Sequence, residues 1–362
     1  MRILIGTPEQ GAHGGPAACE PPFNRELRRR GFAVDEEIYT FSAASGFINR
    51  FQRVLRTARR FQELVSSGNY DLIHLNTSFD TMAVLRDVAV LRRLPRRSTK
   101  LFLKFHGSDG DLLTTNNPVL RGMTNYLLAR ADGIGVLSSE ERDNFLGAGV
   151  SERKLFQVKN VVEPIAATRS PDFREAIGIG PDTPLLLFIG RFIPAKGLLD
   201  CVYACKIIAE RGQKVLLFCV GDGPARAAAE AAVRRLDLES SVRFSGYIPE
   251  ADAAGFYANS TMLLFPTYHY EGFPMVIFNA AAAGLPVITT QIRAAADFLR
   301  EPDNCLWVEA RNPEQLADKI ALLLTDPQLR EQMGQNNRAL ATQFSAEMVA
   351  SEYVEIYQKL VG

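Results

Sequence analysis

The stretch that decides the fold covers residues 271–290, which read EGFPMVIFNAAAAGLPVITT. A Gly-Phe-Pro turn follows the acidic Glu271 and leads into a helix of small apolar residues over 276–283, which Gly284 ends. Residues 285–290 then form a buried strand. The turn leaves backbone N–H groups unpaired at the start of the helix, where a partial positive charge favours anionic or hydroxyl-rich ligands. We therefore expect a ligand site here, the alternative being an ordinary helix start of an α/β protein.

The composition predicts a globular chain with two cores. The 362 residues carry no net charge, and 47% of them are hydrophobic. No run approaches about 18 uncharged apolar residues, and residues 1–6 form a strand without a signal-peptide pattern, so a cytoplasmic protein is expected. The cysteines are odd in number and lack paired metal-ligand spacing, which predicts reduced, buried thiols. They are Cys19, Cys201, Cys205, Cys219 and Cys305.

Strand-like and helical segments alternate along the chain, which predicts two doubly wound parallel sheets with helices on both faces. The alternation pauses over 163–184, a proline-containing stretch that is interpreted as the linker. The predicted strands are 2–6, 33–39, 71–76, 100–106, 133–137 and 156–161 before the linker, and 185–189, 214–220, 242–245, 262–265 and 286–289 after it. Ligands of such sheets bind beyond the carboxyl ends of the strands, so functional residues are expected directly after strands.

Two turns follow strands in the second half, and the first of them carries candidate phosphate-binding groups. In the first, GRFIPAKG, Gly190 follows a strand, and Arg191 and Lys196 place two cations beside a helix start. A planar guanidinium and a compact ammonium could neutralise a diphosphate from two sides; a solvated loop with an incidental ion pair is the alternative. In the second, VGDGP, Gly221 and Gly223 form a tight turn before a helix.

A further strand ends in the sequence FSGYI, which contains Tyr247 and Ile248. The backbone of these two residues could read the edge of a nucleobase, and the Tyr247 ring could stack on the base. An aromatic residue at a strand end belongs to the core or its rim about as often as it forms a ligand platform, so both interpretations stay open.

The first half offers two weaker candidates. Gly14 and Gly15 lead into a helix near Pro16, where the backbone could approach a diphosphate. The G-x-G-x-x-G dinucleotide fingerprint is absent, and a plain strand-to-helix turn explains the glycine pair at least as well. Of the four histidines, only His106 lies between a strand and a glycine turn at the presumed cleft. His106 is therefore the candidate for contact with a transferred group.

No metal site is predicted. Asp109 and Asp111 have the spacing of a D-x-D motif, but two spaced carboxylates alone are weak grounds for Mg²⁺. Cys201 and Cys205 lie one helical turn apart and would form only half of a metal site, since no nearby His or Cys pair completes it.

Five segments, in this order, resemble the family-four retaining glycosyltransferases of GT-B architecture: GRFIPAKG, VGDGP, FSGYIPEAD, EGFP and AAAGLPVITT. The resemblance runs from about Met1 to the terminal helix. It implies two Rossmann-like domains that face a central cleft, with the acceptor side in 1–165 and the nucleotide-sugar side in 166–345. The tail 346–362 is similar to the family's closing helix, which crosses back to the first domain.

The resemblance also implies roles by position. Arg191 and Lys196 would bind the donor diphosphate, and His106 would approach the sugar. Glu271, with the amides of Gly272 and Phe273, would hold the sugar hydroxyls. The implied donor-binding set is Gly14, Gly15, Gly190, Gly221, Gly223, Tyr247, Ile248, Gly272, Phe273, Pro274 and Asn279.

The reaction that the resemblance implies is a hexosyl transfer with retention. Negative charge grows on the departing diphosphate, where Arg191, Lys196 and helix N-termini stabilise it without a required metal or cofactor. The acceptor hydroxyl attacks from the same face and gives its proton to a diphosphate oxygen. A UDP-sugar is the expected donor, ahead of a GDP-sugar, and a glycan or lipid-linked acceptor of cell-surface polysaccharide or glycolipid synthesis is expected.

One position departs from the family pattern. The family usually has a second Glu eight positions after the first, where it binds the nucleotide ribose, and this chain has Asn279 there. The change replaces a charge-assisted hydrogen bond of about 1.5–3 kcal/mol with a neutral one of about 0.5–1.5 kcal/mol. A catalytically weak or silent nucleotide-sugar-binding subunit is therefore the alternative. A GT-B-shaped epimerase or phosphorylase matches these segments less well.

Two basic segments of the first half are candidates for an anionic membrane surface. Residues 46–65 form a basic amphipathic helix, and 91–100 add Arg92, Arg93, Arg96, Arg97 and Lys100. A surface helix that packs its apolar face on the sheet explains 46–65 equally well. Nucleic acid is not an expected partner, because the chain as a whole is not basic and has no recognised binding module. Peripheral attachment to the inner face of the membrane is thus left open.

Overall fold

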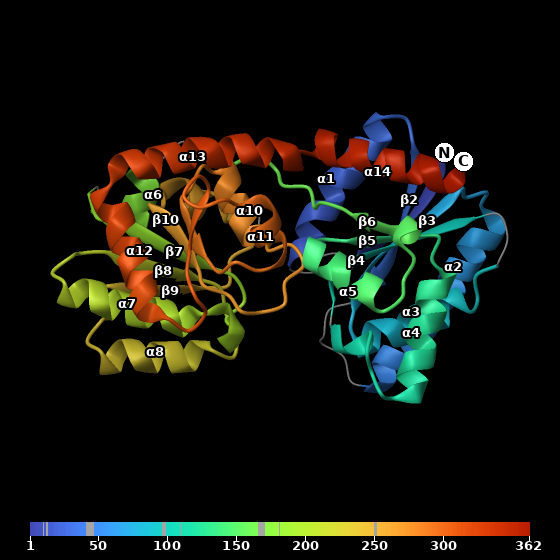
Figure 1. The fold of residues 1–362 in the computed structure, drawn as a ribbon, viewed down its shortest axis with the longest axis horizontal. Helices are drawn as coiled ribbons and strands as arrows, with labels where there is room; N and C mark the ends of the chain where they lie inside the picture. Colours follow the sequence, from blue (N-terminus) through green and yellow to red (C-terminus); the bar gives the residue numbers. More distant parts are fainter. Residues whose placement is uncertain are drawn as a thin grey trace. The chain divides into compact units, whose positions relative to one another are not determined.

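The computed structural model describes residues 1–362 except 10, 12–13, 41–46, 96–98, 109, 166–170, 181 and 250–251, and for 47–50 and 171–172 it describes the backbone only. The chain forms two compact units (Figure 1). The first comprises Met1–Val161, Tyr270–Phe273 and Ala346–Gly362, and the second comprises Val162–His269 and Pro274–Ser345.

The first unit contains a parallel sheet of six strands in the order β2-β1-β3-β4-β5-β6. The strands are β1 (Arg2–Pro8), β2 (Ala33–Thr40), β3 (Leu72–Phe79), β4 (Lys100–Ser108), β5 (Gly133–Val136) and β6 (Leu155–Gln157). The helices are α1 (Gly15–Arg29), α2 (Phe47–Ser67), α3 (Thr81–Leu91), α4 (Pro118–Arg130), α5 (Ser139–Gly147) and α14 (Ala346–Val361). Helix α1 packs beside α14, and α3 packs beside α2 and α4 on the opposite face (Figure 1).

The second unit contains a second parallel sheet of six strands, in the order β12-β11-β10-β7-β8-β9. The strands are β7 (Leu185–Ile189), β8 (Leu216–Val220), β9 (Val242–Gly246), β10 (Met262–Phe265), β11 (Val287–Thr289) and β12 (Cys305–Trp307). The helices are α6 (Pro171–Ala176), α7 (Leu198–Glu210), α8 (Arg226–Arg235), α9 (Ala254–Asn259), α10 (Met275–Ala282), α11 (Arg293–Phe298), α12 (Pro313–Thr325) and α13 (Pro327–Ala341).

The sequence pattern explains why the central strands form where they do. Every residue of β7, β8 and β10 is buried, and so is every residue of β5. Parallel strands that helices cover on both faces require such continuous apolar runs rather than alternation. The predicted two parallel-sheet architecture is confirmed, and each predicted strand corresponds to an observed one.

The structure corrects three details of the predicted elements. The predicted linker 163–184 contains helix α6, whose Phe173 packs edge-on against Phe256 with ring centroids 4.9 Å apart. Strand β12 was not predicted, because Cys305–Trp307 is only three residues long and lies among polar neighbours. Strand β6 ends at Gln157 rather than at 161. In the part of the chain that the structure describes, no helix is both long enough and apolar enough to cross a membrane.

Candidate functional site

In the second unit, backbone hydrogen bonds join the loops that follow β7, β8 and β9. The N–H of Gly190 donates to the carbonyl of Val220 at 2.9 Å, and the N–H of Phe192 donates to the carbonyl of Asp222 at 2.8 Å. The N–H of Gly221 donates to the carbonyl of Gly246 at 2.8 Å. The residues predicted after these strands therefore share one edge of the sheet, the carboxyl edge at which doubly wound sheets bind ligands.

The glycines at this edge are required by the close approach of the loops. Gly221 has a φ of +136°, and a Cβ there would lie 2.0 Å from the carbonyl oxygen of Gly190. Gly223 has a φ of +151°, and its Cβ would lie 2.6 Å from the carbonyl oxygen of Phe192. Since no side chain fits at either position, packing alone accounts for Gly221 and Gly223.

The two predicted cations lie in the loop after β7. Arg191 is exposed, and Lys196 is half-buried at the end of the 3-10 helix η3 (Pro194–Lys196). The Lys196 ammonium lies 5.5 Å from the centroid of the Phe265 ring, at the end of β10, and a Cβ on Gly190 would lie 3.7 Å from it. Lys196 therefore reaches back over the carboxyl edge of the sheet, which is where a cation could meet a diphosphate.

The predicted nucleobase contacts differ in exposure. Tyr247 is 51% exposed, while Ile248 is half-buried and packs against the core of the second unit. The core interpretation therefore applies to the Ile248 side chain, and the Tyr247 side chain is accessible to a ligand.

The stretch 271–290 has the predicted strand–helix layout. Pro274 caps α10, which spans Met275–Ala282. Gly284 follows the helix with a φ of +70°. Asn279 is buried on this helix. Glu271 is half-buried, Gly272 and Phe273 are buried, and all three belong to the first unit, whereas Pro274 and Asn279 belong to the second.

The first-unit candidates lie after β1 and near the end of β4. Gly14 has a φ of +106° and caps helix α1, which begins at Gly15, so the left-handed backbone accounts for the first glycine of the pair. His106 lies near the carboxyl end of β4, and its side chain is only 7% exposed. His13 and Asp109 lie outside the described residues, so the structure does not describe the D-x-D pair.

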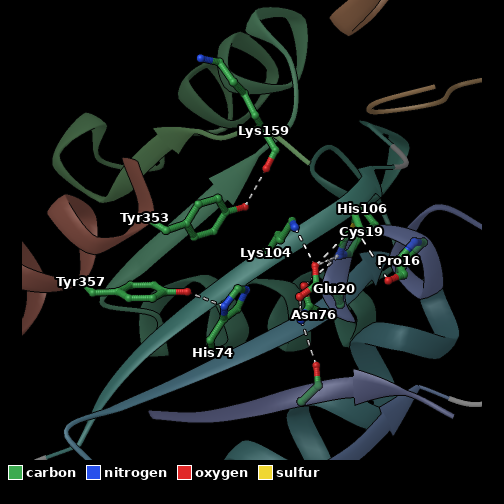
Figure 2. A network of polar contacts seen from close by, with 11 residues as sticks. Pro16, Cys19, Glu20, His74, Asn76, Lys104, His106, Lys159, Tyr353 and Tyr357 are labelled. Atoms are coloured by element: carbon green, nitrogen blue, oxygen red, sulfur yellow. Dashed lines mark hydrogen bonds and ion pairs between the residues drawn. The ribbon is translucent and has the colours of Figure 1, made fainter. Parts of the chain in front are cut away.

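His106 belongs to a buried polar cluster that joins α1, β3 and β4 (Figure 2). Its Nε2 lies 2.8 Å from the Asn76 Oδ1, and the Asn76 amide nitrogen donates to the Glu20 Oε2 at 2.9 Å. The Lys104 Nζ donates to the Glu20 Oε1 at 2.8 Å. The register of β3 and β4 places Asn76 beside Lys104, and Lys104 and His106 share one face of β4, so the sheet brings three of the four side chains together.

The charges of the cluster follow from burial and pairing. Burial raises the pKa of Glu20, but the Lys104 ammonium and the His106 contact outweigh it, and the net pKa lies well below the usual range. Burial lowers the pKa of Lys104, but the Glu20 carboxylate more than compensates, so the net pKa is raised. Burial, with the Lys104 charge, lowers the pKa of His106 to about 4. At neutral pH the cluster is a carboxylate–ammonium pair beside a neutral imidazole.

The same cluster contains a candidate metal group, which its charges disfavour. Cys19, Glu20 and His106 offer ligand atoms within 4.8 Å of one another. The Lys104 ammonium already neutralises the Glu20 carboxylate, and burial raises the pKa of the Cys19 thiol far above its usual range. A metal ion needs a deprotonated thiol and would meet a fixed cation, so the donor set does not fit one.

Sequence reasoning selected His106 but missed the roles of Glu20 and Asn76. The signal that could have found them is Lys104, which lies between apolar residues in the middle of a central strand. A charged side chain in a strand that is buried on both faces requires a buried partner. The identity of that partner depends on how α1 packs on the sheet.

The cysteine prediction is confirmed. All five are free and buried. Cys201 and Cys205 belong to no candidate metal group in the described part of the chain.

Helix α2 combines features of both interpretations of the basic segment 46–65. Ala58 and Phe61 are fully buried in the core of the first unit, while Phe51 is 59% exposed. Arg60 pairs with Glu37 at 3.0 Å, and Arg53 lies 3.9 Å from Glu9. The second half of α2 thus packs on the sheet as an ordinary surface helix. The structure does not describe Gly46, the side chains of residues 47–50, or Arg96 and Arg97 of the segment 91–100.

Comparison with known families agrees with this architecture. The family model described as glycosyl transferases group 1 matches residues 169–340, and the model described as glycosyltransferase family 4 matches residues 20–164. The two matches cover most of both units. The chain belongs to the glycosyltransferase family that these two models describe, glycosyltransferase family 4 with its group 1 domain, and its fold is GT-B.

Three proteins illustrate the similarity. The N-acetyl-alpha-D-glucosaminyl L-malate synthase of Bacillus anthracis is 25% identical over 99% of this chain and 97% of its own length. The capsular polysaccharide biosynthesis glycosyltransferase CapM of Staphylococcus aureus is 30% identical over 49% of this chain, and the match spans about half (46%) of its own length. The crystal structure of Anabaena HepE in complex with UDP-glucose covers 99% of this chain and 100% of its own, with a TM-score of 0.77 at 20% identity.

Proposed function

We propose that this chain is a retaining glycosyltransferase that moves a sugar from a nucleotide-sugar, a UDP-sugar before a GDP-sugar, to a hydroxyl of a glycan or lipid-linked acceptor. The observation that carries the proposal is the position of Arg191 and Lys196 at the carboxyl edge of the second sheet. The HepE structure, which contains UDP-glucose, supports a uridine nucleotide as the first donor to test.

The proposed chemistry depends on where charge develops. As the anomeric C–O bond breaks, the bonding electrons pass to the diphosphate, where Arg191 and Lys196 neutralise the growing negative charge. The acceptor hydroxyl attacks from the same face, and a diphosphate oxygen takes its proton. Two cationic side chains at the leaving group supply the stabilisation that Mg²⁺ gives in other phosphoryl sites, so we propose that no metal or cofactor is required.

The sugar would be held by groups with hydrogen-bonding capacity. We propose that the Glu271 carboxylate and the amides of Gly272 and Phe273 bind its hydroxyls, and that His106 contacts it. Asn279 would bind the ribose, with Tyr247 and Ile248 at the base. The 51% exposed ring of Tyr247 supports a contact with the base.

The acceptor is proposed to belong to cell-surface polysaccharide or glycolipid synthesis. CapM, whose sequence matches about half of this chain, is a capsular polysaccharide biosynthesis glycosyltransferase. The exposed Phe51 and the arginines of α2 support peripheral contact with an anionic membrane at its inner face. Vesicles with and without anionic lipid would test this contact by co-sedimentation, and equal binding to both would contradict it.

The second candidate is a catalytically weak or silent nucleotide-sugar-binding subunit, which Asn279 favours. Thermal unfolding against a panel of UDP, GDP and ADP identifies the base, because a ligand at 100 times its dissociation constant adds about 2.7 kcal/mol of stability. Donor hydrolysis and transfer assays on the pure protein then separate an enzyme from a silent subunit.

Lys196→Ala tests the leaving-group role. We expect transfer to be nearly abolished, since the variant removes a charge that acts on the departing diphosphate. Lys206→Ala is the matched control, because Lys206 lies on α7 of the same unit and pairs only with the exposed Glu210, at 3.4 Å, among the ion pairs that the structure describes. Unchanged turnover in Lys196→Ala would remove Lys196 from the mechanism.

A further inference from the structure

The orientation of the Asn76 side chain is fixed by its two acceptors. Its Nδ2 donates to the Glu20 Oε2 at 2.9 Å and to the Gly6 carbonyl oxygen at 3.1 Å. Neither acceptor can donate, because a backbone carbonyl carries no proton and Glu20 is an ionised carboxylate. The flipped amide would place its oxygen against two acceptors inside a buried site, which is strongly unfavourable.

This orientation decides which ring nitrogen of His106 carries the proton. The Asn76 Oδ1 can only accept, and it lies 2.8 Å from the His106 Nε2. The neutral ring must therefore carry its proton on Nε2, which leaves Nδ1 as an acceptor. The Nδ1 atom is buried and has no hydrogen-bond partner among the residues that the structure describes. A buried acceptor without a partner is costly and indicates a place where a donor group could bind.

Glu20 and Lys104 hold the arrangement in place. The Lys104 Nζ binds the Glu20 Oε1 and leaves the Glu20 Oε2 to accept from Asn76, so each carboxylate oxygen has its own donor. The Lys104 side chain is 3% exposed and the Glu20 side chain is 1% exposed. Together with His106, these three residues form a chain of hydrogen bonds that runs from the Lys104 ammonium through the Glu20 carboxylate and the Asn76 amide to the His106 imidazole (Figure 2).

We propose that Asn76 is a positioning residue that holds His106 as the Nε2–H tautomer, with Glu20 and Lys104 orienting Asn76, so that Nδ1 accepts a hydrogen bond from a ligand hydroxyl. The hydroxyl part of this inference rests on the proposed function, in which the ligand is a sugar. Because protein atoms cover Nδ1, the hydroxyl must displace them to reach it. A ring protonated on Nδ1 could not accept a hydrogen bond at that atom. The tautomer therefore decides whether His106 can bind the ligand hydroxyl through Nδ1.

The tautomer is measured without any ligand. Nitrogen NMR of the protein labelled with ¹⁵N-histidine, with the signals assigned through His106→Gln, should show one protonated nitrogen on His106, Nε2, at pH 7. In Asn76→Leu the acceptor at 2.8 Å is lost and only the Glu20 Oε1, at 3.5 Å, remains near Nε2. We therefore expect an Nδ1–H population to emerge beside the Nε2–H form. An Nδ1–H ring in the wild type, or an unchanged pure Nε2–H ring in Asn76→Leu, would overturn the proposal.

The control separates positioning from stability. Asn337 is an equally buried Asn on α13, where its amide donates to the carbonyl oxygens of Leu285 and Asn304. Asn337→Leu should destabilise the protein by a similar mechanism but leave the His106 tautomer unchanged. If Asn76→Leu does not fold, Asn76→Ala removes the same acceptor with less added volume and gives the same readout.

Activity distinguishes this inference from the proposed function. With a donor that the wild type transfers, Asn76→Leu should lower kcat/KM by about 100-fold, the effect of misplacing a group in an active site. If its tautomer changes while kcat/KM does not, the tautomer assignment stands and the hydroxyl contact is overturned. If the wild type transfers no sugar from any donor, the proposed function fails, and the NMR measurement still tests the role of Asn76.

Discussion

The ammonium of Lys104 lies 2.8 Å from the carboxylate of Glu20, and both side chains are almost wholly buried in the first unit. The pair joins the central strand β4 to helix α1. Two charges taken out of water are tolerated only while each neutralises the other, so the pair makes the packing of α1 on the sheet sensitive to single substitutions.

Glu20→Gln should therefore destabilise the first unit by about 3–5 kcal/mol, because it leaves the Lys104 charge buried without a counter-charge. Denaturant unfolding followed by circular dichroism measures this loss. The double variant Glu20→Gln/Lys104→Met should recover most of it. The exposed pair of Lys206 and Glu210 provides the control, since Glu210→Gln should cost less than about 0.5 kcal/mol. A double variant no more stable than the single one would contradict the charge argument.

The stability of the protein should fall as the pH drops from 7 to 4. Burial lowers the pKa of His106 to about 4 and that of His74, a fully buried residue of β3, to about 3. Both folded values lie below the unfolded value, so the unfolded chain takes up protons first as the pH falls below about 6.5. Each histidine should remove about 3 kcal/mol between pH 7 and pH 4.

Unfolding curves at a series of pH values test this dependence. His106→Gln should reduce the loss of stability in that window by about 3 kcal/mol, because one of the two histidines with a lowered pKa is gone. The pH dependence that remains comes from His74 and from carboxylates with a lowered pKa, such as Glu20. The control is Gln335→Asn, at an exposed position of α13 in the second unit, which changes no titratable group and should leave the slope as it is. A His106→Gln protein with the wild-type slope would show that His106 is not a buried neutral group.

Gly221→Ala should destabilise the second unit by more than about 2 kcal/mol, since the new Cβ would meet a backbone oxygen and also require a strained φ. The matched control is Gly212→Ala. Gly212 also has a positive φ, +78°, but no atom would lie within 4 Å of its Cβ, so only the strain of about 1 kcal/mol is expected. The fluorescence of Trp307, the single tryptophan, reports unfolding of this unit. Equal losses in the two variants would contradict a clash at Gly221.

Asn279→Glu should preserve or strengthen binding of the nucleotide, because a carboxylate would replace a neutral hydrogen bond to the ribose with a charge-assisted one. Calorimetric titration with UDP measures the change. Asn279→Asp carries the same charge on a shorter side chain and should gain less. A large loss of affinity in Asn279→Glu would show that the pocket around α10 is built differently.

Much of the fold could be predicted because the central strands are continuous apolar runs. Strand β7 begins and ends at the residues expected, and α10 begins within one residue of its expected start. The element that was missed, β12, is three residues long, and a segment so short carries no readable period. Helix α6 was not predicted, because Pro171 was interpreted as part of a linker, although proline is favoured at the first position of a helix.

The candidate site was predictable to a smaller extent. The sequence located the loops that follow β7, β8 and β9, since parallel sheets place their ligand groups there. The family resemblance placed Gly221 and Gly223 among the donor-binding residues, whereas the structure shows that the close approach of two loops already requires glycine at both positions. Distances between loops that lie far apart in sequence are set by the sheet and carry no local signal.

The sequence by itself determined the alternation of strands and helices and the positions at which polar residues follow strands, because hydrophobic period and turn chemistry are local properties. Only the tertiary structure decided that Glu20 neutralises Lys104 and that Asn76 meets His106. These residues lie on α1, β3 and β4. Their pairing is determined by the register of the strands and by the packing of α1 on the sheet. A charged residue in a buried strand indicates from the sequence that it requires a buried partner. Only the tertiary structure shows which residue that partner is.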